Sequence, residues 1–218
     1  MKNNKELTSM LYQKRILGIL CILLAPLCLG FGLFGIKTNL PGWYLSISAT
    51  YYANSKMFMI GLLFAISVFL FSYQCYDWRD RVITLIEAVS ALGIVVFPCK
   101  TPGIPETVGI FNINNSISHI IHCIFAAILF LSFAIQITFL FTITKHEMTE
   151  KKRRRNMIYR ICGIVIFVFL AWQVITSAFK FIPSYVPMTW INEFFMLIAY
   201  GFAYLVKSEA IARLNDIK

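Results

Sequence analysis

The chain has 218 residues, of which 59% are hydrophobic and 14% are charged, and its formal net charge is +10 at pH 7. Soluble domains are about 45–50% apolar and about 25% charged, so this composition excludes an ordinary soluble domain and indicates a polytopic membrane protein. The positive charge does not predict nucleic-acid binding, because no basic face is interleaved with exposed aromatic residues. Apolar runs fill the sequence, and we expect a single integral membrane domain over residues 1–218.

Six apolar runs predict an all-α fold, a bundle of six transmembrane helices. A helix needs about 20 apolar residues to cross the hydrocarbon core of a bilayer. The first run is longer than the apolar core of a signal peptide, which has about 7–15 residues, so we expect an uncleaved span. The predicted spans cover residues 16–36, 57–76, 82–99, 116–142, 157–181 and 190–206.

Turn signals mark the connections between these spans. The loop over residues 37–55 contains the dipeptide Pro41-Gly42, which is typical of a turn. Residues 77–81 (DWRDR) predict a short loop, which makes the second and third spans antiparallel neighbours. Pro98 predicts the end of the third span, because proline cannot continue the hydrogen bonding of a helix.

The distribution of basic residues predicts the orientation in the membrane. Of the 20 Lys and Arg residues, 16 fall on the side that carries both termini, and only Lys37, Lys56, Lys100 and Lys180 fall on the other side. The positive-inside rule therefore predicts a multi-pass protein of the cell (inner) membrane with both termini in the cytoplasm. The basic run 151–155 (KKRRR) is either a determinant of this topology or a patch for anionic lipids.

Candidate functional residues gather at the end of the bundle away from the termini. His119 and His122 lie three residues apart, so they share one face of the fourth predicted span, and Ser116 and Cys123 continue that face. This face is small and polar, and we expect it to point into the bundle. The loop before the second span supplies further candidates for a polar pocket: Ser46, Ser48, Tyr51 and Tyr52.

Glu193, near the start of the sixth span, completes this polar set. An acidic side chain close to a membrane boundary is costly unless it is paired or hydrated. On a helix, Glu193 lines up with Tyr200, Gly201 and Tyr204. The spacing therefore predicts a second polar stripe that faces the interior of the bundle.

Four hypotheses remain open for these residues. Two imidazoles and a carboxylate, from His119, His122 and Glu193, form a zinc-compatible ligand set with an open position for water. Alternatively, Ser48 or Ser46 is a nucleophile that a histidine such as His119 activates and Glu193 orients, although no GxSxG elbow is present. In the third hypothesis the histidines and Glu193 hydrogen-bond each other and Lys180, which closes this end of the bundle. The fourth is a ligand or ion pathway.

Glu87 is a separate acidic residue, about two turns into the third predicted span. Arg160, at the start of the fifth span, is its natural partner on the same side of the membrane. A buried ion pair between them would fix helix packing. The alternative is a role for Glu87 in proton-coupled transport.

Six cysteines occur without a CxxC pair, so the sequence does not predict a disulfide framework. Buried thiols that act as small apolar groups are expected instead. Only Cys99 and Cys123 fall towards the same membrane face, where they could meet.

Several segments resemble a family of uncharacterised bacterial six-span membrane proteins, grouped under a domain of unknown function. These segments are SISATYYANSKMFMIGLLFAISVFLFSYQCYD, ALGIVVFPC, the start of the fourth span at His119, and W-x-x-E before the sixth span. The layout also resembles the eukaryotic Frag, DRAM and Sfk proteins, for which roles in lipid remodelling and autophagy are described. The matching positions are Ser48, Tyr51, His119 and Glu193. Where that group has Pro-Pro-Glu in the loop, this chain has Tyr-Tyr-Ala-Asn.

From these patterns we expect a membrane protein with a small polar pocket at its non-cytoplasmic end. The first functional hypothesis is that it binds membrane lipids or supports a protein partner. The alternative is a metal-dependent membrane-embedded lipid hydrolase with zinc as its cofactor, which a weaker resemblance to seven-span zinc lipid amide hydrolases also implies. The second alternative is a small transporter.

Overall fold

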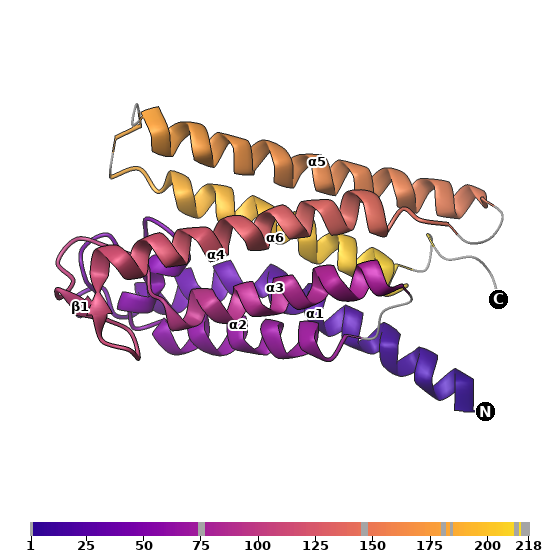
Figure 1. Cartoon of the computed structure of the whole chain (residues 1–218), viewed down its shortest axis with the longest axis horizontal. Helices are drawn as coiled ribbons and strands as arrows, with labels where there is room; N and C mark the ends of the chain where they lie inside the picture. The colour runs from indigo at the N-terminus through magenta and orange to yellow at the C-terminus, as the bar shows by residue number, and fades with distance from the viewer. Residues whose placement is uncertain are drawn as a thin grey trace.

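A computed structural model describes residues 2–73, 77–144, 148–179, 182–183, 185–211 and 214. Within this part of the chain six α-helices run side by side along the long axis of the molecule (Figure 1). They are α1 (Lys2–Leu33), α2 (Lys56–Phe71), α3 (Trp78–Val96), α4 (Asn115–Ile135), α5 (Glu150–Phe179) and α6 (Met188–Lys207).

Four short elements accompany the helices. The 3₁₀-helix η1 (Ser48–Tyr52) lies in the connection between α1 and α2, and the π-helix η2 (Gln136–Leu140) continues α4. The strands β1 (Thr107–Val108) and β2 (Ile113–Asn114) form an antiparallel hairpin between α3 and α4.

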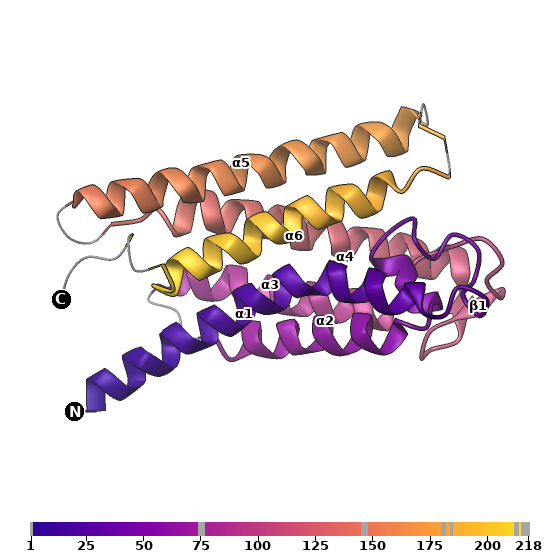
Figure 2. The same cartoon turned by 180° about the vertical axis from the view of Figure 1, so that it is seen from behind.

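Each helix packs against its neighbours in the chain, and α6 returns to pack against α1. The start of α1 and the end of α6 lie at one end of the bundle, here called the termini end (Figures 1 and 2). The β1–β2 hairpin lies at the opposite end, here called the hairpin end (Figure 1). The backbones of α1 and α6 come very close at Gly18 and Gly201, where a Cβ on either residue would lie within 2.7 Å of the other residue's carbonyl oxygen.

The helices have the length and composition of membrane helices. In the described part of the chain, four are long and apolar enough to cross a bilayer: Thr8–Leu33, Asn115–Leu140, Glu150–Phe179 and Met188–Lys207. The apolar helix α2 is shorter, with 16 residues, and α3 carries four charged residues. Large apolar side chains such as Val68, Ile124 and Val174 are exposed on the outer faces. The all-α prediction is therefore confirmed, and several helices are suited to a membrane.

Some helices extend beyond the predicted spans, because hydropathy marks only the apolar part of a helix. The helix α1 begins at Lys2 and α5 at Glu150, so two basic segments predicted to lie outside the spans are helical. Lysine and arginine are good helix formers, so a helix readily continues beyond its apolar part. Most of the predicted loop 77–81 is likewise the first turn of α3, which begins at Trp78.

Candidate functional site

Glu193 holds η1 against the start of α6. Its Oε2 atom accepts a hydrogen bond from the backbone N–H of Ile47 at 2.6 Å, and the backbone N–H of Ser48 also donates to the carboxylate. These N–H groups stand at the start of η1, where no turn of helix precedes them to satisfy them. About one helical turn before Glu193 in α6, the backbone N–H of Trp190 donates to the carbonyl oxygen of Leu45 at 3.0 Å. The contacts of Glu193 and Trp190 thus hold the loop between α1 and α2 against the start of α6.

A small cavity lies beneath this contact. Ser48 and Glu193 provide its polar lining, and its volume is about 30 Å³. A cavity of that size holds roughly two water molecules, whereas pockets for small-molecule ligands measure about 300–1,000 Å³. The cavity at the hairpin end therefore has room for water and not for a lipid headgroup, and of the predicted pocket residues only Ser48 and Glu193 line it. Its apolar lining includes Leu24, Met59, Leu63, Ile94, Leu129 and Leu197.

The histidines bind the connection that follows α3. His122, which is 4% exposed, donates from Nδ1 to the carbonyl oxygen of Phe97 at 2.7 Å. Ser118 donates to the carbonyl oxygen of Pro98 at 2.8 Å. These two side chains satisfy carbonyl groups that the end of α3 leaves without a helical partner.

His119 accepts a hydrogen bond from the backbone, whereas His122 donates one. The Nδ1 atom of His119 accepts a hydrogen bond from the backbone N–H of Lys100 at 3.2 Å, so its proton is carried by Nε2. The ring is only half-buried and lies beside the Cys123 thiol, at 3.7 Å from Nδ1 to Sγ. The two predicted ligands therefore use their Nδ1 atoms for the backbone of residues 97–100.

Tyr52 ties η1 to the same connection. Its hydroxyl donates to the carbonyl oxygen of Cys99 at 2.9 Å, and burial raises the pKa of this hydroxyl, so it remains a donor at neutral pH. Burial also raises the pKa of the Cys99 thiol to about 12. Cys99 and Cys123 are both free thiols, so they do not form the disulfide that was considered from the sequence.

The remaining pocket candidates serve the local structure. Ser46 Oγ accepts from the backbone N–H of Ala49 at 2.9 Å, within the turn that enters η1. Tyr51 presents its ring to the Nζ atom of Lys56, 4.2 Å from the ring centroid. Ser116 is exposed at the start of α4. The predicted inward face of α4 is therefore partly wrong, since Ser116 and the other end of that stripe, Cys123, are exposed.

The structure does not assemble the predicted zinc or catalytic sets. Among the residues that it describes, no three His, Cys, Asp or Glu side chains are arranged to hold a metal ion. Glu193 is hydrogen-bonded to η1, whereas His119 and His122 are hydrogen-bonded to the connection after α3. Ser48 shares a cavity with Glu193, but His119 is not part of its lining. Lys180, the further partner in the hydrogen-bonding hypothesis, lies outside the described residues.

We expect the replacement of His122 by alanine to destabilise the protein more than the replacement of His119. His122→Ala removes a buried donor and leaves a carbonyl oxygen unsatisfied, which costs roughly 1–3 kcal/mol, whereas His119 is half-exposed and water can replace it. Thermal unfolding of the two variants in the same detergent measures the difference. An equal loss of stability in both variants would contradict this assignment.

A second polar cluster lies inside the bundle, around Glu87. This carboxyl group is fully buried, and its Oε2 atom accepts a hydrogen bond from the Tyr200 hydroxyl at 3.0 Å. Its Oε1 atom has no hydrogen-bond partner in the described part of the chain. The ring of Phe133 stacks on Tyr200 with centroids 3.5 Å apart, which keeps solvent away from the pair.

Gln136 extends this cluster towards the termini end. Its Oε1 atom accepts from the Tyr204 hydroxyl at 3.0 Å and lies 3.4 Å from the Tyr200 hydroxyl. Its Nε2 atom donates to the Asp80 carboxylate at 3.1 Å. Gln136 is also the first residue of the π-helix η2. Its backbone carbonyl oxygen accepts a hydrogen bond from the N–H of Phe141, five residues further along the chain. Single π-helical turns occur frequently at functional sites.

The predicted ion pair between Glu87 and Arg160 is wrong. Arg160 is exposed on the outer side of α5, whereas Glu87 faces the interior and is bonded to Tyr200. The prediction that both residues lie on the same side of the membrane could not reveal this, because membrane side does not define the rotation of α5 about its own axis. A surface ion pair does join Arg154 to Glu150 on the same helix.

The small cavity at the hairpin end and the cluster around Glu87 lie on the same faces of α3 and α6. Ile94 and Leu197 line the small cavity, and they are seven residues after Glu87 and three residues before Tyr200, respectively. Residues at these spacings lie above one another on a helix. The cavity therefore lies about 10 Å further along the bundle than Glu87, at 1.5 Å per residue.

Three residues of these clusters, Gln136, Asp80 and Ser118, were not predicted from the sequence. Gln136 had a detectable signal, because it is an amide side chain near the end of the apolar helical run Asn115–Leu140, where polar side chains are costly. Asp80 falls in the predicted loop 77–81, and the predicted polar face of the fourth span does not include Ser118.

The chain matches no known protein-family profile, no curated protein and no solved structure.

Proposed function

We propose that this chain is an integral membrane protein that crosses the bilayer six times, with both termini in the cytoplasm, and that it is a small transporter of protons. The observation that carries this proposal is the fully buried Glu87 carboxyl, which is bonded to a tyrosine hydroxyl and not to a cation. Ionisable side chains inside a membrane bundle are costly and mark ion or proton pathways by default.

The environment of Glu87 suits a group that gains and loses a proton. A buried carboxylate without a cationic partner is expensive, so the neutral acid is the resting form. The Tyr200 hydroxyl stabilises the anion when the proton leaves, because it donates to the Oε2 atom at 3.0 Å. The Oε1 atom, with no partner among the described residues, is the position from which a proton enters or leaves.

Two further carboxyl groups extend the pathway in opposite directions. Towards the termini end, the hydroxyls of Tyr200 and Tyr204 are held by the Gln136 amide, which is bonded to Asp80. Towards the hairpin end, the water-sized cavity leads to Glu193. Water must enter the apolar stretch of about 10 Å between Glu87 and the cavity for a proton to cross it. The entry of water is therefore a step at which proton movement can be gated.

We expect Glu87→Gln to abolish proton movement. The protein is reconstituted in liposomes that contain a pH-sensitive dye, and a potassium diffusion potential, negative inside, drives proton uptake. The wild type should acidify the lumen faster than empty liposomes do. The Glu87→Gln variant should fall to the empty-liposome rate, because an amide preserves size and polarity but cannot exchange a proton.

Glu150→Gln is the matched control, since Glu150 is an exposed acid at the start of α5 and should keep the wild-type rate. Size-exclusion chromatography confirms that both variants remain folded. A wild-type rate no higher than that of empty liposomes, or undiminished uptake by Glu87→Gln, would refute the proposal.

A further inference from the structure

A groove runs along the first turns of α5 at the termini end, apart from the proton pathway. Its volume is about 580 Å³. Basic and apolar residues dominate its lining: Arg153, Arg154, Arg160, Met157, Ile161 and Ile164. Glu150 is the one acidic residue in the described lining.

Basic and apolar residues alternate along one face of α5, and the last lining residues, Ile161 and Ile164, are apolar. Arg153, Met157, Arg160 and Ile164 recur at spacings of three and four residues, so they form a single stripe. This stripe spans roughly 16 Å along the helix axis. Its apolar members are more than half exposed, at 58% for Met157 and 56% for Ile164.

The basic run at the start of α5 is divided between two functions. Lys152 donates to the carbonyl oxygen of Phe141 at 3.2 Å, and Arg155 donates to the carbonyl oxygen of Leu214 at 2.7 Å. These two side chains therefore bind the rest of the protein. The arginines that line the groove point outward instead.

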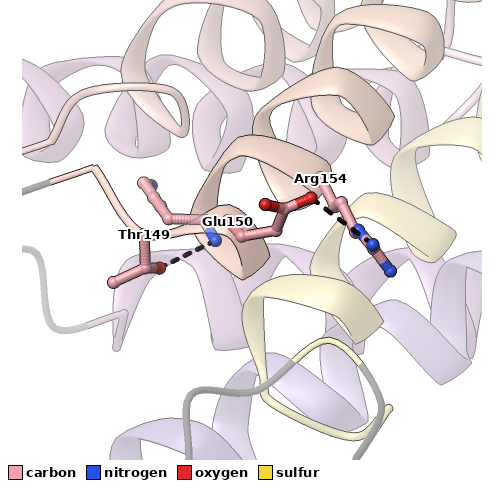
Figure 3. A network of polar contacts seen from close by, with 4 residues as sticks. Thr149, Glu150 and Arg154 are labelled. Atoms are coloured by element: carbon pink, nitrogen blue, oxygen red, sulfur yellow. Dashed lines mark hydrogen bonds and ion pairs between the residues drawn. The ribbon is translucent and has the colours of Figure 1, made fainter.

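The cationic charge of the groove is largely uncompensated. Glu150 lies 3.5 Å from Arg154, and both side chains are well exposed (Figure 3). Arg153 and Arg160 have no acidic partner among the residues that the structure describes. Two guanidinium groups are thus available to an external anion.

The start of α5 is well ordered for such a role. The Thr149 hydroxyl accepts a hydrogen bond from the backbone N–H of Lys152 at 3.1 Å, which is the contact of a helix N-cap (Figure 3). The N-cap contact fixes the first turn, so the arginines are presented from a regular helix.

We propose that this groove binds an anionic phospholipid, with its phosphodiester headgroup at Arg153 and Arg160 and an acyl chain along Ile161 and Ile164. Guanidinium groups match phosphate oxygens in charge and geometry. Basic sites at the cytoplasmic ends of membrane helices are typical positions for anionic lipids. A free phosphate would gain nothing from the exposed isoleucines, so the apolar residues beside the arginines favour a lipid.

Native mass spectrometry of the full chain in detergent tests the proposal with two lipids of identical acyl chains. Phosphatidylglycerol should bind, and phosphatidylcholine should bind at least about tenfold more weakly. Arg153→Gln/Arg160→Gln should weaken phosphatidylglycerol binding roughly 30-fold, the effect expected from two cationic side chains near a membrane surface. Arg153→Lys/Arg160→Lys keeps both charges and should retain most of the binding.

The matched control is Lys37→Gln/Lys56→Gln, which removes two positive charges elsewhere in the chain and should leave binding unchanged. Equal affinity for the two lipids, or an equal loss in the control, would overturn the proposal. Displacement of the lipid by inorganic phosphate at similar concentration would also overturn it, because the site would then be one for a free anion.

Discussion

Replacing Gly201 by leucine is expected to prevent α1 from packing against α6 and to remove most of the folded protein. A Cβ atom at Gly201 would lie 2.6 Å from the carbonyl oxygen of Gly18 and 2.7 Å from a side-chain carbon of Ile22. The carbonyl oxygen belongs to the helix backbone, so it cannot move aside as the end of a flexible side chain can. Close contacts between small residues are a principal source of helix association in membranes.

The consequence extends beyond the two helices. The helix α6 carries Glu193, Tyr200 and Tyr204 into the bundle, and α1 lies against it along their common length (Figure 2). Overpacking typically costs about 1–3 kcal/mol, and more where a backbone must shift. Gly201→Ala should therefore already lower stability, and Gly201→Leu should leave little monodisperse protein after extraction in detergent.

Gly61→Leu is the matched control for this experiment. Gly61 is exposed on α2, and a Cβ there would meet no atom within 4 Å. Its substitution should leave the yield and the size-exclusion profile close to those of the wild type. Comparable yields of Gly201→Leu and Gly61→Leu would show that α1 and α6 do not meet at these glycines.

Replacing Glu193 by leucine is expected to release the first loop from the hairpin end. The carboxylate accepts from the backbone N–H groups of Ile47 and Ser48, and leucine leaves both groups buried without acceptors. The cost should be roughly 2–4 kcal/mol, equivalent to a fall of about 5–15 °C in Tm. Thermal unfolding in detergent measures the loss, and limited proteolysis shows whether the loop over residues 37–55 becomes accessible.

Glu193→Gln separates the hydrogen bonds from the charge. Glutamine retains one acceptor oxygen at the same distance from the backbone, so this variant should lose less stability than Glu193→Leu. Glu106→Ala serves as the control, because Glu106 is an exposed acidic residue at the same end of the molecule. A Glu193→Leu variant as stable as Glu106→Ala would mean that Glu193 does not hold η1.

Some features of the interior were predicted correctly from helical spacing. Glu193, Tyr200, Gly201 and Tyr204 were placed on one inward stripe, and all four are buried. The stripe on the fourth predicted span was less accurate, since His122 is buried but Ser116 and Cys123 are exposed. Both stripes were inferred from spacing alone, and on α4 the true buried face is shifted to include Ser118.

The sequence by itself determined that the chain is a set of long apolar helices, because hydrophobicity along a single segment decides whether that segment suits a bilayer. Only the tertiary structure decided which polar groups meet. Glu87 is bonded to Tyr200, which is 113 residues away, and not to the expected Arg160. Such contacts depend on the rotation and axial shift of each helix against its neighbours, which close packing of small residues such as Gly18 and Gly201 establishes.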